Sequence, residues 1–103
     1  KPIIRCKYNF SLEFLDLDQI TEESFNQLNA DQLLGLVDTL RAGARQARAF
    51  ARAGFGVNGL FSWVVSYVAG KDIAGCYEIA AKFETMAEIA TLKFFDWSPA
   101  NEN

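Results

Sequence analysis

Histidine is missing from the 103 residues of this chain. Without it, the chain lacks the usual general base, the usual metal ligand and the usual partner of a nucleophilic serine or cysteine. The glycines between positions 54 and 59 do not match a nucleotide-binding fingerprint. Paired carboxylates among Glu78, Glu84 and Glu88 remain as an alternative, but we favour solvated charges on a helix. We therefore expect a protein that is not an enzyme, with no catalytic residue, no metal site and no cofactor.

Cysteine is scarce as well. Cys6 and Cys76 lie far apart in the chain, unlike the clustered ligands of a zinc site. No signal peptide is visible, so we expect two free thiols in a reducing cytoplasm rather than a disulfide. An uncharged stretch covers residues 53–70, but asparagine, serine and glycine interrupt it, and its most apolar part is too short to span a membrane. These features predict a soluble, cytoplasmic protein with no membrane contact.

The chain has a net charge of −3, and its charged residues are unevenly distributed along the sequence. Bases without acids occupy residues 1–7 and 41–71, whereas residues 8–40 carry acids alone and residues 72–103 mostly acids. Such blocks indicate that an acidic face meets the basic stretch, either within one chain or between chains.

The N-terminal segment alternates between apolar and polar residues without an error over positions 4–14. Period two over this length predicts a β-strand or an extended arm. Its apolar face consists of Ile4, Cys6, Tyr8, Phe10, Leu12 and Phe14. No second strand is evident, so its backbone groups need a partner. We expect this strand to bind another chain, most simply in a symmetric homodimer. An arm with its backbone in water is the alternative.

The rest of the chain has helical patterns. A short helix over residues 20–28 starts at Thr21, and a long helix over residues 30–53 starts after Asn29, which has Gln32 in the capping-box position. Gly70 and Asp72 end one helix and cap the last one. The segment 57–69 is apolar on every side, which is typical of a buried central helix. We therefore predict one mainly α domain (1–103), with about four helices around this central helix and a frayed tail at 99–103.

The last helix carries apolar residues at alternating intervals of three and four. They are Ile73, Cys76, Ala80, Phe83, Ala87, Ala90 and Phe94. This spacing predicts a buried seam against a neighbouring antiparallel helix or a partner helix. The long helix has its own core stripe of Leu33, Leu36, Val37, Leu40, Ala44, Ala47 and Ala51.

Four arginines form a row on the long helix: Arg41, Arg45, Arg48 and Arg52. At 100° per residue they fall within about 60° of arc. A solvated face, partly neutralised by the chain's own acids, is one interpretation. Contact with carboxylates of a protein partner is the second. Binding to nucleic-acid phosphates is the third, and the acidic balance of the chain disfavours it.

Some apolar residues near the C-terminus do not fit the seam. Ile89, Leu92, Phe95 and Trp97 are the best candidates for an exposed apolar patch, which often marks an interface. With the strand and the arginine row, they indicate a small regulatory protein that binds and blocks or modulates another protein, for example a transcription regulator. The alternatives are a nucleic-acid-binding regulator that uses the arginine row, and a small-molecule-binding domain with a pocket around Trp63 and Tyr67.

Overall fold

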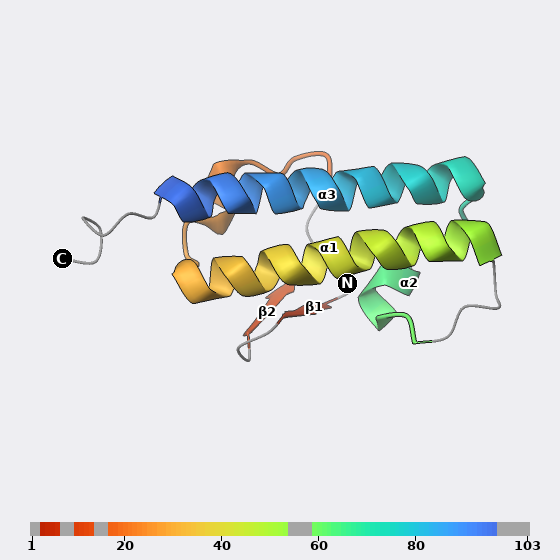
Figure 1. Ribbon diagram of the computed structural model, residues 1–103, viewed down its shortest axis with the longest axis horizontal. Coiled ribbons are helices and arrows are strands. Elements are labelled where there is room, and N and C mark those ends of the chain that lie inside the picture. The colour runs from red at the N-terminus through yellow and green to blue at the C-terminus, as the bar shows by residue number, and fades with distance from the viewer. Residues whose placement is uncertain (1–2, 7–9, 14–16, 54–58, 97–103) are drawn as a thin grey trace.

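The computed structural model describes residues 3–6, 10–13, 17–53 and 59–96. Two long antiparallel helices lie side by side and form the frame of the fold (Figure 1). The elements in chain order are β1 (Ile3–Cys6), β2 (Phe10–Glu13), the 3₁₀ turn η1 (Glu22–Phe25), α1 (Ala30–Ala53), α2 (Ser62–Val68) and α3 (Ile73–Asp96). The mainly helical class is confirmed. Four helices around a central one are not found, because the described residues form three α-helices.

Helix α1 matches its predicted bounds because its start is fixed by local chemistry. The Asn29 side chain accepts a hydrogen bond from the Gln32 amide at 2.9 Å, and the Gln32 side chain accepts one from the Asn29 amide at 3.0 Å. This reciprocal capping box satisfies two donors that a helix start otherwise leaves unpaired. All seven residues of the predicted core stripe are buried.

The interface between α1 and α3 is lined by small side chains. Ala44 and Ala47 are buried on α1, and Ala80 and Ala87 are buried on α3. Because alanine projects little beyond the backbone, the two helices can approach closely. On α3, the seam prediction is confirmed from Cys76 to Ala90, but it is wrong at Ile73, which is 63% exposed at the first position of the helix.

The central helix predicted over residues 57–69 is wrong in position and role. Residues 54–58 lie outside the described part, and α2 has only seven residues. Its inner side is buried through Trp63, Val64, Tyr67 and Val68, whereas Phe61 and Val65 are each 40% exposed. Gly70 follows it with φ of +78°, as expected for a glycine that reverses the chain after a helix. The segment is therefore a short covering helix, and α1 and α3 form the frame on which it packs.

The single strand predicted over residues 4–14 is also wrong, because the segment folds back on itself. Strands β1 and β2 pair antiparallel, with Ile4 opposite Leu12 and Cys6 opposite Phe10. One edge of each strand therefore finds its hydrogen-bonding partner in the other strand of the same chain. The predicted strand residues Tyr8 and Phe14 lie outside the described residues.

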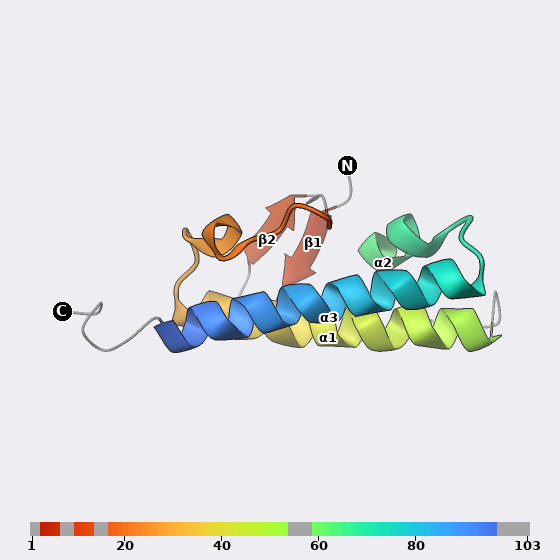
Figure 2. The ribbon, with the colours of Figure 1, turned by 90° about the horizontal axis from the view of Figure 1, so that it is seen from above.

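The hairpin, η1 and α2 form a second layer on one side of the α1–α3 pair (Figure 2). In this layer Ile4 and Phe25 are fully buried. The segment around η1 is held to α3 by a 2.8 Å ion pair between Asp18 and Lys82. Asp72 caps α3 as predicted, because its carboxylate accepts a hydrogen bond from the Gly75 amide at 2.7 Å. The described core thus lies between the helix pair and this second layer.

Candidate functional site

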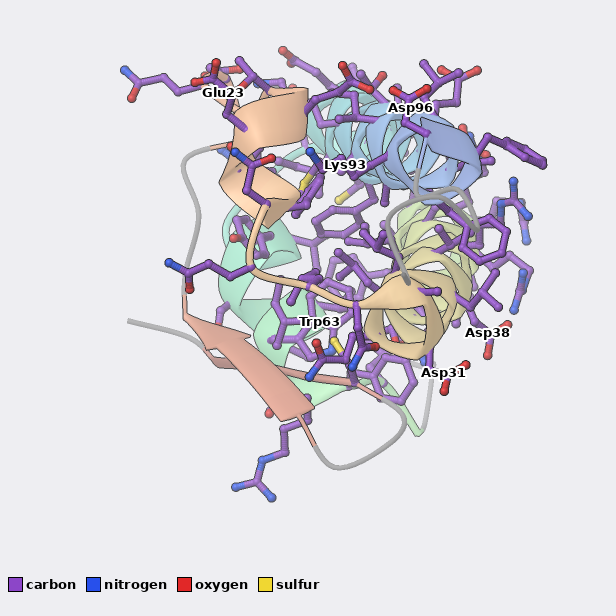
Figure 3. All side chains as sticks on the ribbon, turned by 90° about the vertical axis from the view of Figure 1, so that its left-hand side faces the viewer. Glu23, Asp31, Asp38, Trp63, Lys93 and Asp96 are labelled. Carbon is purple, nitrogen blue, oxygen red and sulfur yellow. The ribbon has the colours of Figure 1, made fainter. Side chains whose placement is uncertain are left out.

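The side of the α1–α3 pair away from the second layer is not covered by other described elements. Figure 2 shows this bare side, and in Figure 3 Asp31 and Asp38 of α1 point away from the hairpin, while Trp63 points into the interior. We call this side the open face. Its residues are Leu34, Asp38, Arg41, Arg45, Arg48 and Arg52 on α1 and Tyr77, Glu84, Glu88, Leu92 and Phe95 on α3.

Helical periodicity places the arginine row on the open face. Gly43 lies beneath Trp63 and therefore faces the second layer. Arg41 and Arg45 are each two residues from Gly43, which turns them about 160–200° away from it. The row is therefore a feature of the exposed surface, as its spacing predicts.

One arginine of the row is neutralised within the chain. Arg48 donates two hydrogen bonds to the carboxylate of Glu84, one of them at 3.0 Å. These bonds raise the pKa of the Arg48 guanidinium and lower the pKa of the Glu84 carboxyl. The expectation that the basic stretch meets the chain's own acids is therefore confirmed at Arg48. Among the described residues, Arg41, Arg45 and Arg52 form no ion pair.

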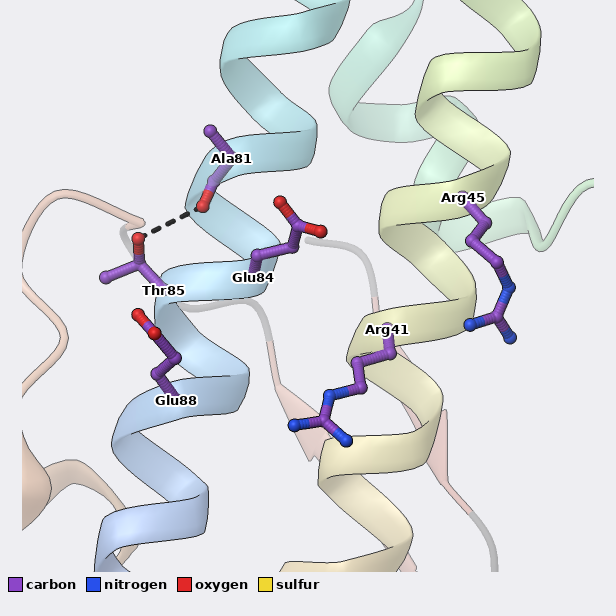
Figure 4. Close-up of a pocket in the computed structure, with 6 residues that line it drawn as sticks. All are labelled: Arg41, Arg45, Ala81, Glu84, Thr85 and Glu88. Atoms are coloured by element: carbon purple, nitrogen blue, oxygen red, sulfur yellow. Dashed lines mark hydrogen bonds between the residues drawn. The ribbon is translucent and has the colours of Figure 1, made fainter.

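A groove of about 580 Å³ lies along the middle of the open face. Arg41 and Arg45 line it from α1, and Glu84, Thr85 and Glu88 line it from α3 (Figure 4). Figure 4 shows Arg41 extending toward α3 and Arg45 extending away from it. The Thr85 hydroxyl donates to the Ala81 carbonyl at 3.1 Å and so is engaged within its own helix. The groove therefore offers both guanidinium donors and carboxylate acceptors.

The groove continues into an apolar end of the open face. Leu92 is 59% exposed and Phe95 is 73% exposed, and both line a second depression of about 490 Å³ beside Arg41. The predicted patch is present at these two residues. Ile89 is only half-buried and packs against the core, and Trp97 lies outside the described residues.

Sequence reasoning missed two apolar residues of the open face. Leu34 is 46% exposed, and helical periodicity places it on the same side of α1 as Arg41, two turns earlier. Tyr77 is 39% exposed near the other end of the face. The signal for Leu34 was its position beside Leu33 and outside the core stripe.

The strand residues serve the interior of the chain. Ile4 is fully buried, and Cys6 is half-buried against the core. Burial raises the pKa of the Cys6 thiol to about 11, although a hydrogen bond with Thr39 partly opposes that shift. Burial also raises the pKa of Cys76. Both cysteines are free thiols, as predicted. For Phe10 and Leu12, the structure describes the backbone pairing alone.

Trp63 and Tyr67 fill the space between the layers. Each ring meets Phe83 edge-on, with ring centroids 5.1 Å and 5.3 Å apart. The aromatic cluster expected to surround a small molecule is therefore packed against the chain's own Phe83. The buried Trp63 Nε1 has no hydrogen-bond acceptor among the described residues.

In the described part of the chain, no three side chains of histidine, cysteine, aspartate or glutamate gather closely enough to hold a metal ion. Within the same residues, no helix has the length and apolar character needed to cross a membrane. Comparison with protein-family models, with curated proteins and with solved structures found no match.

Proposed function

We propose that this chain is a non-enzymatic regulatory protein that binds another protein through the open face and blocks or modulates it. A transcription regulator is one example of such a target. The observation that carries the proposal is the exposure of Leu92 and Phe95 beside the arginine row. Exposed apolar side chains rimmed by charges are typical of protein interfaces, where aromatic residues and arginine supply much of the binding energy.

The acids of the open face favour a protein partner over a nucleic acid. Glu84 and Glu88 line the same groove as Arg41 and Arg45, so a phosphate backbone would meet carboxylates as well as guanidinium groups. A protein surface with mixed charges can satisfy both. We therefore expect no tight binding of DNA or RNA in filter-binding assays at low salt.

Site-directed photocrosslinking in the cells that produce the protein tests the proposal. A photoreactive phenylalanine analogue at Leu92 is expected to yield a covalent adduct with a different protein. The same analogue at Glu22, which is exposed on η1 in the second layer, is the matched control and is expected to yield none. Adding the chain to the captured protein is expected to change the activity of that protein.

Two results would contradict the proposal. One is an identical adduct pattern from Leu92 and Glu22, because the open face would then have no special role. The other is tight, salt-sensitive binding of DNA or RNA that is lost in the Arg41→Glu, Arg45→Glu variant, because the row would then contact phosphates.

A further inference from the structure

The open face is divided lengthwise by charge. The helix α1 side carries the four arginines of the row and one acid, Asp38, and the α3 side carries Glu84 and Glu88. Among the described residues the only ion pair on this face joins Arg48 to Glu84. Arg41, Arg45 and Glu88 are exposed, so most of the face keeps its charge available to a partner.

The antiparallel packing determines which charges lie at the same level along the helices. The Arg48–Glu84 pair fixes the register. Each step toward the N-terminus of α1 is matched by one toward the C-terminus of α3, so Arg45 is level with Glu88. Arg41 is about level with Leu92, and both line the same depression. Leu34 lies within about one turn of the level of Phe95.

We propose that the open face binds the same face of a second copy, with a two-fold axis parallel to the helices. This inference goes beyond the proposed function, because it names a second copy of the chain, which a different protein would have to displace from the same face. The rotation places α1 of one copy over α3 of the other at the same level. Arg45 then meets Glu88 of the partner subunit, and Leu34 meets Phe95 of the partner subunit. Every helix of the resulting four-helix bundle has antiparallel neighbours of opposite charge.

The charges also exclude the other symmetric arrangement of two open faces. A two-fold axis in the interface but perpendicular to the helices would place α1 over α1 and α3 over α3. Arginine rows would then face each other, as would Glu84 and Glu88 with their copies. Like charges at an interface are strongly unfavourable, so the parallel axis is selected.

The open face is large enough for such a dimer. Each of its helices has 24 residues, which gives a length of about 36 Å at 1.5 Å per residue. Two helices about 10 Å apart present a width of about 20 Å, so each copy contributes about 700 Å². A standard interface buries about 800 Å² per partner. Since charges occupy the middle of the face, we expect a salt-sensitive dimer.

Sedimentation velocity of the full chain tests the proposal over about 1 µM to about 200 µM, a range that covers weak association. We expect a dimer that weakens as sodium chloride rises from about 0.1 M to about 1 M, since the Debye length falls from about 10 Å to about 3 Å. Arg45→Glu and, separately, Glu88→Arg are each expected to raise the dissociation constant at least about tenfold. An equimolar mixture of these two variants is expected to dimerise as tightly as the unmodified chain, because opposite charges meet again.

Two control variants keep the fold and the total charge comparable. Arg5→Glu on the hairpin and Glu23→Arg on η1 make the same charge changes at exposed positions of the second layer. Both are expected to dimerise like the unmodified chain. Circular dichroism of all four variants is expected to give the same helical signal, because these side chains are exposed.

Several outcomes would overturn the dimer proposal. A monomer at the highest concentration and low salt would do so, as would a failure of the mixture to restore association. Stronger association of Arg45→Glu would indicate the perpendicular axis, and loss of the dimer in Arg5→Glu alone would indicate a hairpin-mediated contact. A monomer that still crosslinks to a different protein through Leu92 refutes the second copy but supports the proposed function. A dimer that crosslinks at Leu92 only to itself supports the second copy and refutes regulation of another protein.

Discussion

Gly43 is the position where a single methyl group tests the packing of α2 on the frame. A Cβ atom built there would lie 2.3 Å from Cη2 of Trp63, 3.0 Å from Cζ2 and 3.2 Å from Cζ3. Carbon atoms in contact are normally at least about 3.5 Å apart, so the Trp63 ring would have to retreat by about 1 Å. Phe61 stacks on this ring at 5.9 Å between centroids and Phe83 meets it edge-on, which restricts that movement.

The magnitude follows from two opposing effects of Gly43→Ala. Alanine is favoured over glycine in a helix interior by about 0.8–1 kcal/mol. Overpacking a core costs about 1–3 kcal/mol, and the upper end applies because a rigid ring is displaced. We expect a net loss of about 2 kcal/mol in the free energy of unfolding. At about 4–8 °C per kcal/mol, the Tm falls by about 10 °C.

Urea unfolding followed by far-UV circular dichroism measures this loss. In a Trp63→Phe background, the ring atoms that collide with the new methyl group are absent, so Gly43→Ala is expected to stabilise the protein by up to about 1 kcal/mol. Ala49→Gly, on the same helix but away from the ring, is the control for helix propensity and is expected to cost about 1 kcal/mol. If Gly43→Ala stabilises the unmodified chain, α2 does not pack on α1 as described.

Three further outcomes are expected. Ile4→Ala is expected to cost about 2–5 kcal/mol in urea unfolding, because it empties a fully buried site between the hairpin and α1; a loss below about 1 kcal/mol would mean that the hairpin is not docked. The stability contributed by the Cys6 thiol is expected to fall between pH 9 and about pH 11, because the unfolded thiol releases its proton in that interval while the folded thiol keeps it. Cys6→Ala is expected to reduce the measured slope, to which the buried Cys76 thiol also contributes, and an unchanged slope would refute the assignment. Glu84→Gln is expected to cost less than about 1 kcal/mol at neutral pH, because its pair with Arg48 is half exposed; the loss disappears in acid, where Glu84 is protonated.

The long helices could be predicted because their signals are local. The capping residues of α1, its buried stripe and the Asp72 cap of α3 each act within a few residues of the chain. The alanines of the stripe are buried, and α3 packs closely against them. The open face depends on a different kind of information, because Arg48 and Glu84 are 36 residues apart and meet only when α1 and α3 pair. Their register is not visible in either helix alone.

The prediction of a central helix is wrong because a lack of charge does not by itself imply burial on all sides. The segment around α2 contains no charge, yet Phe61 and Val65 are each 40% exposed. Small residues allow the longer α1 and α3 to bury each other, and this leaves α2 at the periphery. The packing partner of each helix, rather than its own hydrophobicity, decided which helices form the frame.

The single strand was mispredicted because the hairpin preserves the alternation of apolar and polar residues. Even-numbered residues of β1 pair with even-numbered residues of β2, and odd-numbered residues with odd-numbered ones. Residues paired in an antiparallel ladder point to the same side of the sheet. Ile4 pairs with Leu12 and Cys6 with Phe10, whereas Ile3 pairs with Glu13 and Arg5 with Ser11. Each pair therefore joins two positions of the same parity, and the even-numbered pairs share one face. A single strand over residues 4–14 and a hairpin in this register therefore have the same apolar face. Period two alone cannot distinguish them, and the sequence between Cys6 and Phe10 contains neither glycine nor proline.

The hairpin changes the physical case for a dimer. A lone strand would leave backbone donors and acceptors unpaired along both edges, and a second copy of the strand was expected to satisfy them. Pairing of β1 with β2 already satisfies one edge of each strand, and the fully buried Ile4 fixes the hairpin on its own chain. By contrast, Leu92 and Phe95 keep most of their surface in water, beside charges that are arranged in complementary rows. The open face therefore gains more from association than the hairpin edges do, and a dimer that uses it leaves the hairpin intact.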